Sequence, residues 1–371
     1  MADHNLGPVV GWREVTLSHL VEFQRGRDIT VANIVKGIYP VAGSNGVIGF
    51  HDEFTSTGPG ITLGRSGNSI GVSHFYTGNF WAHNTTLYSK RFGEACPKYM
   101  FYLLRTLDFS GFDSGSAIPS LNRNYIHALT VRAPGIGEQR AIANVLTCLD
   151  DKIDLLHHQN QTLEAMAETL FRQWFLESEN EGWDEKPLSS IANFLNGLAC
   201  QKYPSANDVD KLPVLKIREL SNGITDSADW ATSQVKPDYI VEAGDVIFAW
   251  SASLMVKVWD GERCVLNQHL FKVTSREFPK WFYLRWCKHH LAEFIAISAS
   301  HATTMGHIKR GDLDAARVLV PPPTVLDAMS QQMTPLLDKQ MAIARQRKTL
   351  EKLRDTLLPK LMSGEVRVAC W

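Results

Sequence analysis

Three short segments of this chain carry residue types that could do chemistry. Residues 60–67 are glycine-rich but end in Arg-Ser-Gly, whereas an ATP-binding phosphate loop needs Gly-Lys followed by Ser or Thr. Residues 83–86 (His-Asn-Thr-Thr) and 267–269 (Asn-Gln-His) offer imidazole groups that could transfer protons. Neither has an acidic or nucleophilic partner at a spacing that indicates a catalytic pair. The residues therefore favour a chain that catalyses no reaction by itself.

The motifs of common cofactor and metal sites are also missing from the sequence. There is no Asn/Asp-Pro-Pro-aromatic tetrapeptide and no glycine-rich loop for S-adenosylmethionine, and the only adjacent prolines are at 321–323. The six cysteines are scattered, with no CxxC pair and no His/Cys cluster. We therefore expect this chain to bind no cofactor and no metal, and to reside in a reducing compartment.

Length and composition indicate a globular protein of two or three domains. The chain has 371 residues, of which 44% are hydrophobic and 21% are charged. It has no run of 18 apolar residues, and its first residues lack a basic segment followed by an apolar one, so we expect a cytoplasmic protein. The net charge of −1 gives no overall basic field, so any nucleic-acid contact must come from local clusters.

An internal repeat divides the chain into two copies. Near the start of each copy, Trp12, Leu17, Ser18, Phe23 and Gly26 recur at an offset of 171 as Trp183, Leu188, Ser189, Phe194 and Gly197. Further on, twelve residues recur at an offset of 187, from Pro134 and Pro321 to Leu170 and Leu357. Two helices of similar composition would share leucines but not these polar residues. The sequence therefore predicts a duplication.

Each copy is predicted to consist of an α+β body followed by one long helix. Apolar runs such as YPVAG and DVIFAWSAS alternate with Gly-, Asn- and Pro-rich turns, a pattern typical of strands and loops. Pro134 and the prolines at 321–323 mark the point before each helix. The predicted segments are body 1–135, helix 136–180, body 181–325 and helix 326–371.

Both helices carry the seven-residue period of a coiled coil. The repeating residues are Leu149, Ile153, Leu156, Leu163 and Leu170 in the first helix, and Leu336, Ile343, Leu350 and Leu357 in the second. The first helix has three Lys/Arg and eight Asp/Glu, and the second has eight and five, so their charges favour pairing with each other. We expect an antiparallel intramolecular pair with Asn160, Arg347 and Arg354 fixing its register. The alternative is that each helix packs only on its own body.

The entry to the first helix is similar to a known family. Residues 134–143 are Pro-Gly-Ile-Gly-Glu-Gln-Arg-Ala-Ile-Ala, and residues 149–154 are Leu-Asp-Asp-Lys-Ile-Asp. Together with the tryptophan-led openings, Gly-Arg-Ser-Gly at 64–67 and Gly-Ser-Ala-Ile-Pro at 115–119, the chain resembles the specificity (S) subunits of type I restriction–modification systems. The second helix departs from the motif and has Leu-Asp-Ala-Met at 326–329, so the repeat and the heptads carry the resemblance there.

The resemblance implies two target-recognition domains joined by spacer helices. The bodies 1–135 and 181–325 would each bind one half of a split site in double-stranded DNA, and the helices would form an antiparallel coiled coil between them. It also implies docking of two copies of a DNA adenine methyltransferase (M) subunit and, in the complete complex, of motor-nuclease (R) subunits. The chain itself would be non-catalytic, with S-adenosylmethionine, ATP and Mg held by its partners.

Local clusters are expected to supply the DNA contacts that the resemblance implies. The first body has eleven Lys/Arg and nine Asp/Glu, and the second has sixteen and seventeen, so neither is strongly basic. Arg65 suits bidentate contact with guanine, and Asn68 suits adenine. The candidates are Arg25, Arg27, Arg65, Ser66, Asn68 and Arg123 in the first body, and Lys216, Arg218, Ser251, Lys257, His301, Lys309 and Arg310 in the second.

Two other functions stay open at this point. An orphan interaction protein, either a mobile-element S subunit or a DNA mimic, could act on a host complex; a mimic would need a strongly acidic surface, which a net charge of −1 does not favour. A stand-alone DNA-binding regulator would leave the long helices unexplained, and no helix–turn–helix signal is evident. Copurification with a methyltransferase separates these possibilities.

Overall fold

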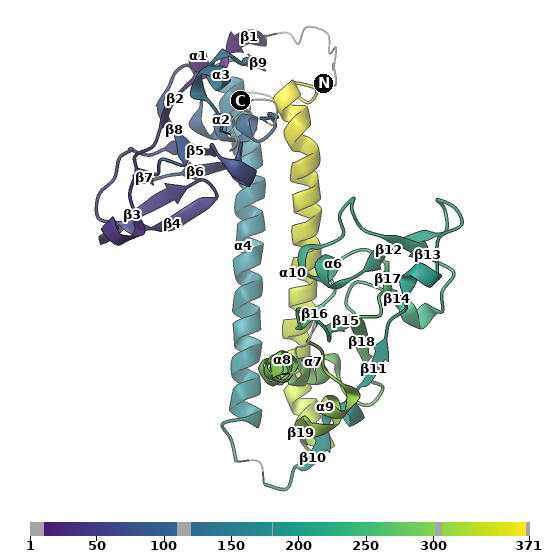
Figure 1. The fold of residues 1–371 in the computed structure, drawn as a ribbon. Coiled ribbons are helices and arrows are strands. Elements are labelled where there is room, and N and C mark those ends of the chain that lie inside the picture. The colour runs from purple at the N-terminus through teal and green to yellow at the C-terminus, as the bar shows by residue number, and fades with distance from the viewer. Residues whose placement is uncertain (1–10, 110–119, 180, 301–305, 369–371) are drawn as a thin grey trace. The chain divides into compact units, whose positions relative to one another are not determined.

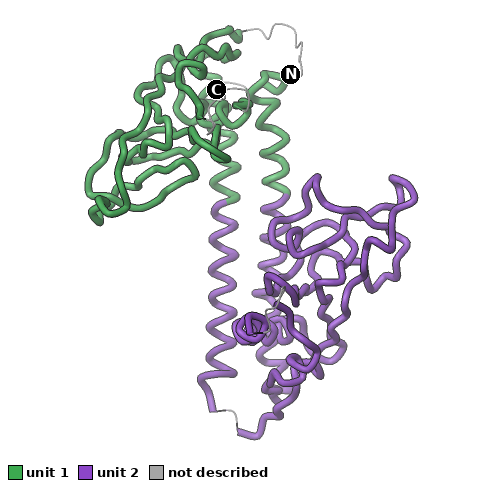
Figure 2. The backbone as a smooth tube through the Cα atoms, in the orientation of Figure 1, with its two compact units in different colours: residues 1–153, 349–371 green, residues 154–348 purple. Residues whose placement is uncertain are grey.

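The computed structural model describes residues 11–109, 120–179, 181–300 and 306–368. The chain divides into two compact units, unit 1 with residues 1–153 and 349–371, and unit 2 with residues 154–348 (Figures 1 and 2). Two long helices, α4 (Ile136–Phe175) and α10 (Pro323–Ser363), each contribute to both units. Among the residues described, no helix combines the length and the apolar character that a membrane span requires.

The body of unit 1 is built from short strands in three small sheets, ordered β1-β9, β2-β8-β5-β6 and β4-β3-β7. Its strands are β1 (Arg13–Thr16), β2 (Val21–Arg25), β3 (Lys36–Gly43), β4 (Gly46–His51), β5 (Gly60–Gly64), β6 (Ser73–Tyr76), β7 (Trp81–Ala82), β8 (Thr86–Phe92) and β9 (Thr130–Ala133). Its helices are α1 (Leu17–Leu20), η1 (Val31–Asn33), η2 (Gly67–Ser69), α2 (Pro97–Leu104) and α3 (Arg123–Ala128).

The body of unit 2 repeats this plan, with sheets ordered β10-β19, β11-β18-β15-β16 and β13-β12-β17-β14. Its strands are β10 (Asp184–Pro187), β11 (Asn193–Asn196), β12 (Lys211–Leu215), β13 (Trp230–Thr232), β14 (Ile240–Val241), β15 (Val246–Ala249), β16 (Met255–Val258), β17 (Cys264–Leu266), β18 (Leu270–Thr274) and β19 (Arg317–Val320). Its helices are α5 (Leu188–Ile191), η3 (Cys200–Lys202), α6 (Ile217–Asn222), η4 (Pro237–Tyr239), α7 (Lys280–His289), α8 (Leu291–Ser300) and α9 (Arg310–Ala315).

The predicted duplication is confirmed, and the repeated residues occupy equivalent places. Leu17 and Leu188 each begin the short helix after the first strand, and both are completely buried. Phe23 and Phe194 lie in the next strand and are also buried in the core of their own unit. These shared residues are therefore the ones that build the scaffold of each body.

Gly26 and Gly197 show why one repeated position must be glycine. A Cβ on Gly26 would lie 2.1 Å from the carbonyl oxygen of His83, and a Cβ on Gly197 would lie 2.2 Å from that of Asn267. Each glycine therefore lets the chain leaving β2 or β11 touch the turn that follows β7 or β17. A larger residue would have to push this backbone apart.

In unit 1 the beginning of α4 and the end of α10 complete the core of the body. Ile142 and Leu146 from α4 and Leu358 and Leu361 from α10 are buried in the same cluster as Leu17. Arg354 of α10 donates a hydrogen bond to Asp150 of α4 over 2.9 Å. The two helices therefore contact both each other and the first body.

In unit 2 the end of α4 and the beginning of α10 complete the core of the body. Phe171 and Phe175 of α4 and Met333 and Leu337 of α10 are buried with Trp281 of α7. The start of one helix lies with the end of the other in each unit, as the antiparallel pairing requires. The alternative in which each helix packs only on its own body is therefore wrong.

The residues predicted for the helix seam differ in burial. Ile153, Leu156 and Ile343 are buried. Partly exposed are Leu149, Leu163, Leu170, Leu336, Leu350 and Leu357. Of the polar seam residues, Arg354 bonds across the helices, whereas Arg347 lies 3.7 Å from Asp260 of the body. Whether these residues fix the register stays a prediction, as do the exact boundaries of bodies and helices.

A charged cluster, termed the Glu164 cluster, joins α4, α7 and α10 within unit 2. The carboxylate of Glu164 accepts hydrogen bonds from Arg285 (2.9 and 2.8 Å), Lys288 (2.6 Å) and Gln340 (3.0 Å). Burial would raise the pKa of Glu164, but Lys288 and Arg285 outweigh it and hold this pKa at about 2. Glu164 is therefore ionised at neutral pH, and its charge anchors α7 to both long helices.

Candidate nucleic-acid interface

In unit 1 two of the predicted arginines converge on one turn of the backbone. Arg65 directly follows β5, and its Nη1 lies 3.5 Å from the carbonyl oxygen of Asn84 while its Nη2 donates to Ser120 over 2.9 Å. Arg25, the last residue of β2, donates to the same Asn84 oxygen over 3.3 Å. The structure therefore brings together residues that lie forty positions apart in the sequence.

The charge of this cluster is positive. Burial and the positive charge of the neighbouring Arg25 both lower the pKa of Arg65. Arg27 is exposed two residues beyond Arg25. Asp28 is the acid nearest to them in sequence, and it accepts a hydrogen bond from Asn84 over 2.7 Å. Three arginines beside one carboxylate make a surface suited to phosphate oxygens or to a guanine edge.

The other predicted residues of unit 1 lie beside this cluster. Ser66 pairs with Ser120 in an isolated bridge, and the backbone N–H of Leu121 donates to the carbonyl oxygen of Arg65 over 2.7 Å. Arg123 follows two residues later at the start of α3, where its side chain is exposed. Asn68 is exposed in η2. The predicted residues therefore share one region, although which of them contact DNA stays a prediction.

Unit 2 has a structurally equivalent position with different chemistry. Trp250 and Ser251 follow β15 as Arg65 and Ser66 follow β5, and Ser251 pairs with His307 as Ser66 pairs with Ser120. The indole N–H of Trp250 donates to the side chain of Asn196 at the end of β11 over 3.1 Å. An aromatic and imidazole surface therefore replaces the arginine surface of unit 1.

Ser251 is held inside this second cluster. The residue is only 4% exposed, and its hydroxyl lies 3.1 Å from Nδ1 of His269. The Trp250 ring lies 6.0 Å from the His269 ring and stacks on Phe271 at 5.6 Å. The hydroxyl of Ser251 thus supports the cluster from within.

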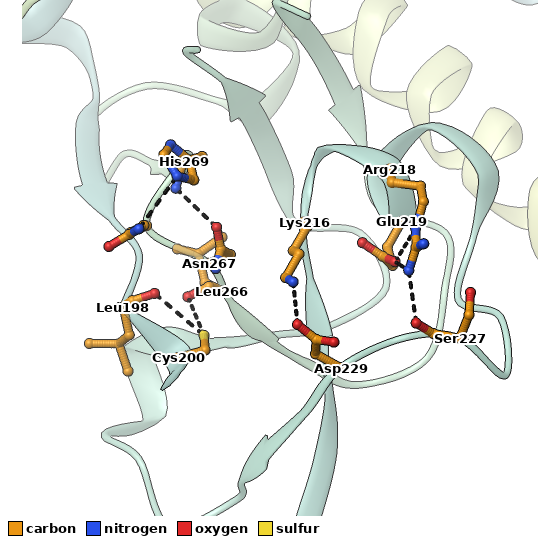
Figure 3. A network of polar contacts seen from close by, with 11 residues as sticks. Leu198, Cys200, Lys216, Arg218, Glu219, Ser227, Asp229, Leu266, Asn267 and His269 are labelled. Atoms are coloured by element: carbon orange, nitrogen blue, oxygen red, sulfur yellow. Dashed lines mark hydrogen bonds and ion pairs between the residues drawn. The ribbon is translucent and has the colours of Figure 1, made fainter. Parts of the chain in front are cut away.

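Two predicted cations of unit 2 have acidic partners, as Figure 3 shows. Lys216 pairs with Asp229, and Arg218 bonds to the buried carboxylate of Glu219 at 2.7 Å. The backbone N–H of Asn267 donates to the carbonyl oxygen of Leu215, which places Lys216 beside the turn after β17. Lys216 therefore lies next to the equivalent turn, and both cations have their charge balanced by a carboxylate.

The remaining predicted residues of unit 2 lie elsewhere. Lys309 and Arg310 are exposed at the start of α9, the counterpart of α3. Lys257 lies on β16 and donates to the carbonyl oxygen of Leu220 over 3.1 Å. His301 lies outside the described residues. The predicted set of unit 2 is therefore spread over several places.

Sequence reasoning missed the residues that complete both clusters. These are Asn84 and Ser120 in unit 1, and Asn196, Trp250, His269 and His307 in unit 2. The histidine-bearing segments 83–86 and 267–269 each form the turn that leads into a central strand, β8 or β18. Aligning the two copies at these turns would have pointed to Asn84 and His269, but not to the four residues that lie elsewhere in the chain. In the part of the chain that the structure describes, no group of three His, Cys, Asp or Glu residues is arranged to hold a metal ion.

Comparison with known proteins accounts for both copies. Residues 9–165 and 180–352 match the family described as type I restriction modification DNA specificity domain. The chain belongs to this family. Each match covers one body and most of the helix after it, so each copy of the repeat corresponds to one specificity domain. The membership inferred from residues 134–154 is thereby confirmed.

Named relatives support the same assignment, and a solved structure shares the fold. The chain is 26% identical over 300 residues to the type I restriction enzyme MjaIX specificity subunit of Methanocaldococcus jannaschii, covering 73% of this chain and 69% of the relative. It is 18% identical over 359 residues to the HindI specificity subunit of Haemophilus influenzae, covering 73% and 77%. The crystal structure of the type I restriction-modification system S subunit from M. genitalium has the same fold, with a TM-score of 0.66 and 15% identity over 97% of both chains.

Proposed function

We propose that this member of the specificity-domain family is the DNA-recognition subunit of a type I restriction–modification complex, and that each body binds one half of a bipartite site. One observation carries the proposal. The same half-buried position of the duplicated scaffold bears Arg65 in one body and Trp250 in the other. A shared scaffold with different side chains at one surface is what reading two different half-sites requires.

The chemistry of the two clusters suits DNA in different ways. Arg25, Arg27 and Arg65 can bind phosphates or the O6 and N7 atoms of guanine. Trp250 and its imidazole neighbours offer apolar contact to a thymine methyl group and hydrogen bonds to base edges. Lys216 and Arg218 would have to exchange their carboxylate partners for phosphates to contribute.

The proposal assigns the long helices to docking of two methyltransferase subunits and to spacing between the half-sites. Large apolar side chains are exposed along them, including Leu155 and Met166 on α4 and Leu353 on α10. A docked partner would cover these side chains. The chain itself would be non-catalytic, with S-adenosylmethionine, ATP and Mg bound by the methyltransferase and motor-nuclease subunits.

Coexpression with the methyltransferase subunit of the same system tests this function. The complex, supplied with S-adenosylmethionine, should methylate adenines in both halves of one gapped sequence, which methylome sequencing would identify. The purified chain alone should transfer no methyl groups. Methyl transfer by the chain alone, or sequence-specific DNA binding with no methyltransferase association, would overturn the proposal; the second result would instead support a stand-alone regulator.

A further inference from the structure

A cavity of about 400 Å³ lies within unit 2 where α4, α7, α10 and β16 meet. Such a volume is typical of small-molecule sites. Asn160 from α4, Lys280 from α7 and Lys257 from β16 are among the residues that line it. The cavity is separate from the Trp250 cluster, none of whose residues lines it.

The charges lining the cavity do not balance. Five Lys or Arg residues and two carboxylates line it. Both carboxylates already have cationic partners: Glu164 is bound by Arg285 and Lys288, and Asp260 lies 3.2 Å from Lys348. Positive charge is therefore in excess.

Two ammonium groups contribute to this surplus. Lys257 donates to the carbonyl oxygen of Leu220 over 3.1 Å, and Lys280 donates to that of Gly244 over 2.7 Å. Among the contacts described, neither lysine has a carboxylate partner. An ammonium group has three donors, so each lysine keeps two for another acceptor. A site with two such groups suits an anion that bears several oxygens.

Asn160 adds a polar group without a protein partner. Its Oδ1 is buried and makes no hydrogen bond to any described residue. Rotation of the amide by 180° would present the Nδ2 group and its two donors in the same place. A buried polar atom without a partner is costly, so a bound acceptor that pairs with the rotated amide would be favourable.

We propose that this cavity binds a compact anion of the phosphate class. Its two sources are a free polyphosphate or nucleotide and a phosphate of the DNA backbone. A bound anion would balance the charges of Lys257 and Lys280 and would touch α4, α7 and β16 at once. Binding would therefore stabilise the packing of unit 2.

Titration of the full chain with sodium pyrophosphate tests the proposal. Calorimetry should show saturable binding of one pyrophosphate, and at ten times the Kd the melting temperature should rise by about 3 °C. The double variant Lys257→Gln and Lys280→Gln keeps a hydrogen-bond donor at each position but removes both charges. It should bind pyrophosphate at least about tenfold more weakly, which corresponds to losing one charged contact.

A matched control removes two other charges from the same unit. Lys202→Gln with Lys236→Gln changes two exposed lysines, and this variant should bind pyrophosphate like the parent chain. A short DNA duplex separates the two sources: competition with pyrophosphate would assign the cavity to a DNA phosphate, and independent binding would assign it to a free anion. Absence of saturable binding, or equal affinity in both double variants, would overturn the proposal.

Discussion

The Glu164 cluster predicts that removing its two main partners has unequal costs. Glu164→Gln leaves the guanidinium of Arg285, which is 2% exposed, with Glu168 at 3.5 Å as its remaining carboxylate. We expect a loss of about 3 kcal/mol in the free energy of unfolding, because an unpaired buried charge costs about 3–5 kcal/mol and Glu168 offsets part of it. Arg285→Met leaves Glu164 bonded to Lys288 and Gln340, so we expect a loss of only about 1–2 kcal/mol.

The same cluster predicts a dependence on pH. The pKa of Glu164 is lowered from an ordinary value of 4.5 to about 2. The ionised carboxylate therefore contributes fully to stability above about pH 4.5, and this contribution is lost as the pH falls toward 2. A shift of this size would be worth about 3 kcal/mol in full, and solvent screening reduces it to about 1–2 kcal/mol because the side chain is 39% exposed. The advantage of the parent chain over Glu164→Gln should therefore be constant from pH 7 to 5 and smaller by a few tenths of a kcal/mol at pH 4.

Urea unfolding at pH 7, 5 and 4, combined with hydrogen–deuterium exchange in α7 and in residues 154–175, would measure these effects in unit 2. Glu168→Gln is the matched control, because its carboxylate is 52% exposed and more distant from Arg285, and we expect a cost below about 0.5 kcal/mol. An Arg285→Met cost equal to or above that of Glu164→Gln would refute the reasoning. So would a difference between the parent and Glu164→Gln that does not change from pH 7 to pH 4.

Three further predictions concern the two bodies. Arg65→Ala should weaken discrimination at the first half-site by about 1–3 kcal/mol in competition binding by the methyltransferase complex, with the second half-site unchanged. Trp250→Ala should weaken discrimination at the second half-site and leave the first unchanged. An equal loss of discrimination at both half-sites in either variant would contradict independent recognition by the two bodies. Gly26→Ala should lower the stability of unit 1 by at least about 2 kcal/mol in thermal unfolding, because its Cβ would lie 2.1 Å from the His83 oxygen. Gly78→Ala, whose Cβ would meet nothing within 4 Å, should change stability by less than about 1 kcal/mol, and a similar loss in both would argue against the steric cause.

The duplication and the long helices could be predicted from sequence because their signals are periodic. Leucines every seven residues indicate a paired helix wherever the partner lies. The body that each helix end completes carries no such signal: Leu358 and Leu361 join Leu17 in one core although more than three hundred residues separate them. Contacts of this range depend on the folded chain, and no local pattern encodes them.

The candidate interface was predictable only in part, for a related reason. Arg25 and Arg65 stand out as cations near glycines, but their common acceptor is a backbone oxygen of Asn84, which no residue type reveals. Asp229 balances Lys216 because β13 pairs with β12, so a cation that looks available in the sequence is neutralised by folding. Trp250 was missed because a tryptophan in an apolar run is typical of a core residue.

The positions at which the two copies keep or change a residue indicate how the DNA sequences of their half-sites would compare. The two copies have the same residue where the scaffold constrains it. Leu17 and Leu188 each fill a core, and at another shared position only glycine fits. Identity is lost at the position after β5 and β15, where Arg65 and Trp250 face different partners. A guanidinium offers five donors in a fixed fork, whereas an indole offers one donor and a large apolar face, so the two suit different contacts. If these positions contact DNA bases, we expect the two half-sites to differ in sequence and the proposed bipartite site to be asymmetric.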